Sequence, residues 1–131
     1  MAMNILVVDD KQEMASFLTL YLKNKGYSSR GVCSVQEAWE LLSKEKFDVV
    51  ITDVCLKESS GLILLKSIKS RGDTTAVVMM SGYAQPQQVV ECLNLGAYDF
   101  LFKPFHLEVL AEVLQNIKNR NQRFAEMGVD I

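Results

Sequence analysis

Five side chains of this sequence have the types needed for chemistry on a phosphoryl group. Asp9 and Asp10 are adjacent, and like charges placed together cost free energy unless a cation or a shared proton compensates them. A third carboxylate, a hydroxyl and an ammonium follow later in the chain, at Asp53, Ser81 and Lys103. Three carboxylates with water form the oxygen environment that Mg²⁺ accepts. If the five meet, Asp53 is expected to attack phosphorus, while the metal, Ser81 and Lys103 hold the phosphoryl oxygens.

Each of these residues follows a short apolar run, and the runs predict β-strands. Four runs lie at 5–8, 49–51, 76–80 and 100–102, and segments with helical periodicity separate them. A weaker strand is expected in "YSSRGVCS", whose polar residues suit the edge of a sheet. Gly26, Gly72 and Gly96 are expected to end helices, and Ser34 with Glu37 forms a capping box. The alternation indicates βαβ units in a mainly parallel sheet.

The predicted fold class is α/β, a flavodoxin-like doubly wound sheet of five parallel strands in the order 2-1-3-4-5 with five helices. The runs at 5–8, 49–51 and 76–80 are almost wholly apolar, so we expect them at the centre, covered on both faces. Ligands of such sheets bind beyond the carboxyl ends of the strands, which lie at one edge. The five polar side chains are therefore expected to converge there.

Composition restricts the class of protein further. The chain has 131 residues, 49% of them hydrophobic, which suits one globular domain, expected at 1–119, with 120–131 as a C-terminal tail or the start of a linker. A net charge of -2 and 14 scattered basic residues argue against direct binding to nucleic acid or to an anionic membrane. Without an apolar run of about 20 residues or a signal-peptide pattern, a soluble cytoplasmic protein is expected. The three cysteines, Cys33, Cys55 and Cys92, are expected to be packed free thiols.

Four segments, "VVDD", "VITDV", "MMSGYA" and "GAYDFLFKPF", resemble the receiver domain of two-component response regulators, and the resemblance spans residues 4–119. It implies that Asp53 is the phospho-acceptor, that Asp10 is a direct Mg²⁺ ligand, and that Asp9 is a second acidic ligand acting largely through water. The backbone carbonyl of Cys55 would complete the protein's metal ligands.

The same resemblance assigns the residues that respond to phosphorylation. Ser81 matches the switch hydroxyl, Phe100 the switch aromatic and Lys103 the phosphate-binding lysine, and Lys103-Pro104 resembles the family's cis peptide bond. We expect Ser81 to move toward the phosphoryl group and the ring of Phe100 to turn from solvent into the vacated space. Phe100 lacks the hydroxyl that many relatives carry, so its switching must depend on packing.

The implied function is a signalling switch, catalysing only its own phosphorylation and dephosphorylation. A sensor histidine kinase would phosphorylate Asp53 in the presence of Mg²⁺. The fourth helix ("QQVVECLNL"), the fifth strand and the fifth helix would then change shape to control a partner, a homodimer or an effector domain in a longer chain. The fifth helix is expected to begin near His106, for which a surface or capping role is predicted, and to reach about residue 124.

Two other functions fit part of the pattern. A phosphatase of the haloacid dehalogenase type also uses an aspartyl nucleophile. Its general acid and base is a second aspartate two residues later, and this chain has Cys55 at that position, so the group needed for turnover is missing. A flavin carrier of this fold needs a phosphate loop with free N–H groups, whereas "DDKQEM" is acidic and repels phosphate when no metal is bound. After the acceptor, Leu56 and Lys57 stand where the family often has Met-Pro, so this loop is expected to be more mobile.

Overall fold

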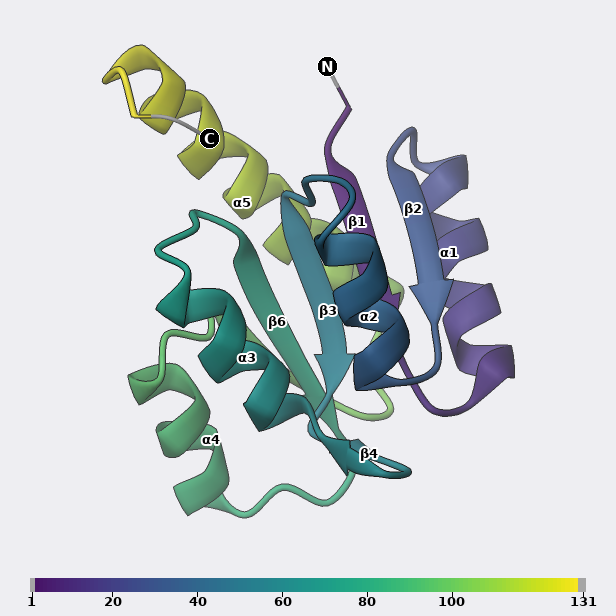
Figure 1. Cartoon of the computed structure of the whole chain (residues 1–131). Helices are drawn as coiled ribbons and strands as arrows, with labels where there is room; N and C mark the ends of the chain where they lie inside the picture. Colours follow the sequence, from purple (N-terminus) through teal and green to yellow (C-terminus); the bar gives the residue numbers. More distant parts are fainter. Residues whose placement is uncertain (1, 130–131) are drawn as a thin grey trace.

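Five parallel strands form the central sheet of the protein, whose computed structural model describes residues 2–129 (Figure 1). The strands are β1 (Asn4–Val8), β2 (Ser28–Val32), β3 (Val49–Asp53), β6 (Ala76–Ser81) and β7 (Asp99–Phe102). Their order is β2-β1-β3-β6-β7, which is 2-1-3-4-5 when these five are counted along the chain. The predicted flavodoxin-like topology is confirmed.

The positions of the strands follow from their side chains. Residues 49–53 of β3 and 76–81 of β6 are buried throughout, and β1 is buried after its first residue. Strand β2 has exposed residues at three of its five positions and lies at one edge of the sheet, as its polar sequence predicts.

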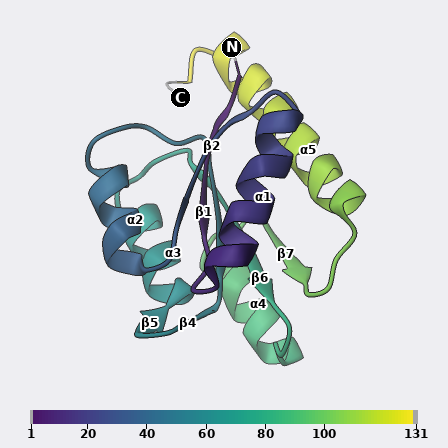
Figure 2. The same cartoon turned by 90° about the vertical axis from the view of Figure 1, so that its right-hand side faces the viewer.

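Five helices cover the two faces of the sheet: α1 (Gln12–Asn24), α2 (Val35–Leu42), α3 (Gly61–Ser70), α4 (Pro86–Asn94) and α5 (Leu107–Glu126). Helices α1 and α5 lie on one face and α2, α3 and α4 on the other (Figures 1 and 2). Successive residues of a strand point to opposite faces, so Ile5 and Val7 pack with α1 and α5, while Leu6 and Val8 join the second core. Because alternate residues are buried in the two cores, the cores fix the face of the sheet toward which the last side chain of each strand points.

The predicted helix ends are also present. Gly26, Gly72 and Gly96 follow α1, α3 and α4 with φ of 94°, 74° and 105°, a backbone conformation that glycine adopts without strain. At the start of α2 the Ser34 hydroxyl accepts a hydrogen bond from the Glu37 N–H at 3.1 Å. His106 stands at the N-cap of α5 and is exposed, with no capping hydrogen bond from its side chain.

Helix α5 ends close to the expected position, at Glu126 rather than near residue 124. The segment predicted as a C-terminal tail or the start of a linker, residues 120–131, is therefore helical up to Glu126, and residues 130–131 lie outside the described part of the chain. Its last turns project beyond the sheet at the end away from β4 (Figure 1). Within residues 2–129, no helix combines the length and the apolar character needed to cross a bilayer.

A short hairpin after β3 was not predicted. Strands β4 (Cys55–Leu56) and β5 (Ser59–Ser60) pair antiparallel, and two-residue strands are too short to give an alternating pattern. The hairpin exposes Cys55, so the prediction of three packed thiols is wrong at this position, although all three cysteines are free and Cys92 is buried. The hairpin thus shapes the loop directly after Asp53.

Candidate functional site

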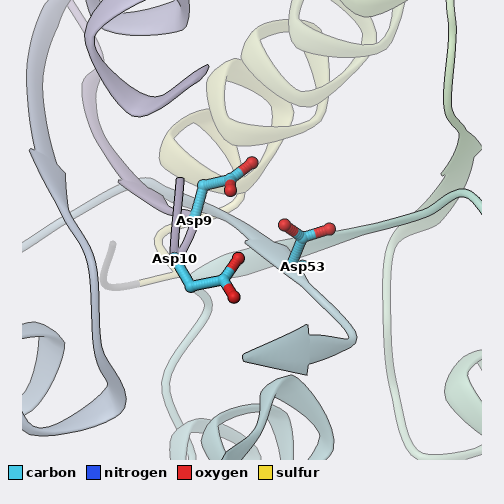
Figure 3. Close-up of side chains that lie close together, drawn as sticks. All are labelled: Asp9, Asp10 and Asp53. Atoms are coloured by element: carbon cyan, nitrogen blue, oxygen red, sulfur yellow. The ribbon is translucent and has the colours of Figure 1, made fainter. Parts of the chain in front are cut away.

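Three carboxylates gather at the carboxyl edge of the sheet, where sequence analysis placed them (Figure 3). Asp9 and Asp10 follow β1, Asp53 is the last residue of β3, and each offers an oxygen within 4.8 Å of the others. Asp9 is fully buried, Asp53 is 7% exposed, and Asp10 is exposed. Buried negative charges this close require positive partners.

Lys103 supplies one of those partners. Its Nζ donates to Asp9 Oδ2 and to Asp53 Oδ2, at 2.9 Å each. The residue follows β7 directly, and its backbone N–H donates to the Ser81 carbonyl at 2.9 Å, which joins its position to the end of β6. One ammonium against three carboxylates leaves a negative surplus at the site.

The pKa values reflect this arrangement. The pKa of Asp53 is raised from 3.8 to about 6, mainly by burial; the hydrogen bond from Lys103 opposes the rise and the charge of Asp9 adds to it. Burial lowers the pKa of Lys103, but the hydrogen bonds and charges of Asp53 and Asp9 outweigh it and hold that pKa above its ordinary value. Lys103 is therefore a cation at neutral pH.

The donor atoms fit Mg²⁺, a hard cation that prefers oxygen and tolerates bound water. Both oxygens of Asp9 are engaged, Oδ1 by the Lys11 N–H at 2.9 Å and Oδ2 by Lys103. Asp10 is exposed and faces the same cluster, so its carboxylate is available to a cation. This difference suits a site in which Asp10 binds metal directly and Asp9 acts through water.

Ser81 lies at the end of β6 and lines the same cleft as Asp53 and Lys103. It is 7% exposed, and its Oγ accepts a hydrogen bond from the Tyr83 N–H at 3.1 Å. Because Oγ is the acceptor in that bond, its O–H can still donate to a group in the cleft. Five of the predicted site residues are thus brought together.

Phe100 lies elsewhere and in an unexpected orientation. Its ring is 7% exposed and packs in the core beneath α2, α3 and α4, rather than standing in solvent in the unphosphorylated chain. The neighbouring aromatic on the same face, Phe102, is 54% exposed, with ring centroids 5.1 Å apart. The expected outward starting position of Phe100 is therefore wrong, because this face of β7 is covered at residue 100 and open at residue 102. The Lys103-Pro104 peptide bond is cis, as expected.

A cleft of about 620 Å³ opens beside the carboxylates. One part is polar, with Asp10, Asp53, Ser81 and Lys103, and Cys55 lines it too. The rest of the wall is largely apolar and comes from α1, the loop after β6 and the start of α5; it includes Met14, Phe17, Leu18, Tyr83, Pro104, Phe105 and Leu107. Asp53 is therefore approached across an apolar surface.

Two residues that the sequence did not single out contact the backbone carbonyl of Asp53. Gly61 lies so close to the acceptor that a Cβ there would overlap the Asp53 carbonyl oxygen. The Thr52 hydroxyl donates to that same oxygen at 3.0 Å. A glycine at the start of a helix and a threonine inside a strand carry no signal of such contacts in sequence, because the contacts depend on the tertiary fold.

Comparisons with known proteins agree with this geometry. The family model described as "Response regulator receiver domain" matches residues 5–115. The chain is 36% identical over 126 residues to the response regulator protein PilR of Pseudomonas aeruginosa, covering 95% of this chain and 28% of that protein. It is 33% identical to the regulatory protein VanR of Enterococcus faecium, covering 95% of this chain and 54% of VanR. This chain therefore spans only part of the length of both relatives.

A solved structure extends the agreement to three dimensions. The response regulator receiver domain protein from Clostridium thermocellum superposes with a TM-score of 0.88 at 26% identity, covering 95% of this chain and 99% of that one. The motifs, the strand order and the cluster of Asp9, Asp10, Asp53 and Lys103 fit the same family. The chain belongs to the receiver domains of two-component response regulators, which act as phosphorylation-dependent signalling switches.

Proposed function

We propose that Asp53 accepts a phosphoryl group from a sensor histidine kinase in a reaction that requires Mg²⁺. The observation that carries the proposal is the cluster of Asp9, Asp10 and Asp53, whose carboxylate oxygens lie within 4.8 Å of one another, with Lys103 bridging Asp9 and Asp53. Asp10, Asp53, Asp9 through water, and the backbone carbonyl of Cys55 would hold the metal. Bound Mg²⁺ supplies positive charge for the transferred phosphoryl oxygens.

The reaction is an in-line transfer between two protein side chains. A carboxylate oxygen of Asp53 forms a bond to phosphorus as the bond from phosphorus to the donor histidine nitrogen breaks, and the electron pair of that bond returns to the imidazole. Lys103 donates hydrogen bonds to the developing oxyanion, and the Ser81 hydroxyl turns toward it. An ionised Asp53 is the nucleophile, and a pKa of about 6 leaves it mostly ionised near neutral pH.

The cleft indicates where the donor protein approaches. Asp53 is reached past the half-exposed ring of Phe17 on α1 and the Tyr83 side chain, which is 93% exposed. Exposed aromatic side chains are typical anchors of protein interfaces. We place the histidine kinase on this side of the molecule.

Phosphorylation of the isolated domain tests the assignment. Phosphoramidate with Mg²⁺ should add one phosphoryl group, detectable by intact mass, and Asp53→Asn should remove the reaction. Asp10→Asn should greatly weaken both Mg²⁺ binding and phosphorylation, whereas the distant surface variant Asp73→Asn, at a residue that pairs with Arg71, should react like the native protein. Equal modification of Asp53→Asn and the native protein would exclude Asp53 as the acceptor.

The output surface is proposed on α4, β7 and α5. Exposed apolar side chains occur on all three elements, at Val90, Leu93, Phe102 and Val109. Exposed apolar side chains on neighbouring elements suit contact with a partner, a second copy of the domain or an effector domain in a longer chain. Because Phe100 is already buried, the change is expected at Phe102 and α4 rather than as an inward swing of Phe100.

Beryllofluoride, a phosphoryl mimic, provides the test of this surface. NMR shifts on addition of beryllofluoride and Mg²⁺ should extend from Asp53 to Phe102 and α4, and sedimentation in the two states should report any dimer. Shifts confined to the carboxylate cluster would contradict a signal that passes to this face.

A further inference from the structure

The backbone at the end of β3 is held by an unusual set of contacts. Pairing between β1 and β3 ends at Val8 and Thr52, so Asp53 lies one residue beyond the last paired position on that side. Its carbonyl accepts a hydrogen bond from the Thr52 hydroxyl at 3.0 Å, and Thr52 is fully buried. A buried carbonyl without a partner is costly, so this hydroxyl satisfies a need that the sheet leaves open.

The next peptide is held from the other side. The Gly61 N–H donates to the Val54 carbonyl at 2.7 Å, and the Ser60 hydroxyl donates to the same oxygen at 3.2 Å. Gly61 also packs directly on the Asp53 carbonyl, where a Cβ has no room. The carbonyls of Asp53, at the end of β3, and of Val54, the next residue, are thus held by Thr52 before them and by Ser60 and Gly61 at the end of the hairpin.

These two peptides connect the groups that the reaction uses. They lie between the Asp53 carboxylate and the Cys55 carbonyl, both assigned above to the metal. Residues 54–60 contain no proline, so no ring in this loop fixes its backbone. The hydrogen bonds from Thr52, Ser60 and Gly61 are the interactions that order these two peptides.

We propose that Thr52 is a positioning residue for phosphoryl transfer: its hydroxyl fixes the Asp53–Val54 peptide and so presets the carboxylate and carbonyl that hold Mg²⁺. This inference rests on the proposed phosphorylation of Asp53. The Thr52 hydroxyl bonds to the backbone carbonyl of the acceptor, so its proposed effect passes through that backbone. Residues that orient metal ligands are commonly worth about 10- to 100-fold in metal affinity.

The experiment compares Thr52→Val, which keeps the branched shape and removes the hydroxyl, with Thr52→Ser, which keeps the hydroxyl. The matched control is Thr75→Val. The Thr75 hydroxyl is also buried and donates to a backbone carbonyl, that of Phe47, at 2.9 Å. Thr75 precedes β6 and so lies at the opposite edge of the sheet from the carboxylates. Each variant is assayed by calorimetric titration with Mg²⁺ and by its rate of phosphorylation by phosphoramidate at saturating Mg²⁺, together with its unfolding midpoint.

Thr52→Val should bind Mg²⁺ about tenfold more weakly and react about tenfold more slowly. Thr52→Ser should stay within about twofold of the native protein in both measurements, since the donor is retained. Thr75→Val should lose stability but keep native Mg²⁺ affinity and rate. If Thr52→Val does not fold, Thr52→Ala removes the same hydroxyl with less crowding and carries the same expectation.

Three results would overturn the inference: native Mg²⁺ affinity and rate in the variant without the hydroxyl, equal losses in Thr75→Val, or equal losses in Thr52→Ser. Each is distinct from failure of the proposed function, in which the native protein itself would not be phosphorylated at Asp53. In that case the Mg²⁺ titrations still decide whether Thr52 positions the metal site.

Discussion

Replacing Asp53 by Asn is expected to stabilise the metal-free domain at neutral pH. Asp53 is buried beside Asp9, and its folded-state pKa of about 6 lies above the unfolded value of 3.8. A raised carboxyl pKa means that the folded state disfavours the ionised form. Asparagine has nearly the same shape and carries no charge, so the variant escapes this cost.

The magnitude follows from the shift. The rise of the pKa from 3.8 to about 6, which already includes the opposing attraction of Lys103, corresponds to about 3 kcal/mol at 1.36 kcal/mol per pKa unit, an upper limit because nearby water screens the charge. Lys103 keeps its 2.9 Å contact with Asp9 after the substitution. We expect Asp53→Asn to raise the free energy of unfolding by about 1–3 kcal/mol above pH 7.

The sign of the pH dependence is fixed by proton binding. Between pH 3.8 and about 6 the folded state holds the Asp53 proton more tightly than the unfolded state, so this group's contribution to stability falls as pH rises through that window. The advantage of the variant should therefore be small near pH 4 and reach its plateau above pH 7.

Urea denaturation from pH 4 to pH 8 in the presence of a chelator measures this directly. Asp73→Asn controls for the loss of a surface carboxylate, and added Mg²⁺ should stabilise the native protein more than Asp53→Asn. A variant no more stable than the native protein at pH 8 would refute the reasoning, since the attraction of Lys103 would then outweigh the burial of Asp53.

Two further substitutions test the surroundings of the acceptor. Gly61→Ala should lower the free energy of unfolding by more than about 2 kcal/mol and disturb the Asp53 backbone, because the new Cβ overlaps the Asp53 carbonyl. Gly82→Ala, whose Cβ would have no neighbour nearer than 3.8 Å, should lower it far less. Chemical denaturation and Mg²⁺ titration of both variants compare the two effects. Tyr83→Ala should lose phosphate from Asp53 several-fold faster than the native protein, because the exposed ring at the cleft hinders the attacking water, and equal decay rates followed by mass would contradict that shielding.

The sheet and its functional edge were predictable because both depend on local patterns. Uninterrupted apolar runs identify central parallel strands, and in such a sheet the carboxyl ends of the strands lie at one edge. Asp53 and Lys103, 50 residues apart, were therefore expected at the same edge, where they do form a hydrogen bond. Sequence could not show the orientation of Phe100, because this depends on how far the covering helices extend along β7. Nor could it show that Gly61 and Thr52 contact the acceptor, since close approach of backbone is a property of the assembled core.

The shared ammonium of Lys103 explains how one site can tolerate both states of the proposed switch. In the unphosphorylated chain it contacts Asp9 and Asp53 through one oxygen of each, at equal distances of 2.9 Å. Phosphorylation would place roughly two negative charges just beyond Asp53. Lys103 can then keep its bond to the fully buried Asp9 while it exchanges Asp53 for a phosphoryl oxygen. Asp9 would thus hold the Lys103 ammonium in place in both states. Removing the charge of Asp9 should therefore weaken the positioning of Lys103 directly, and affect Asp53 only through Lys103.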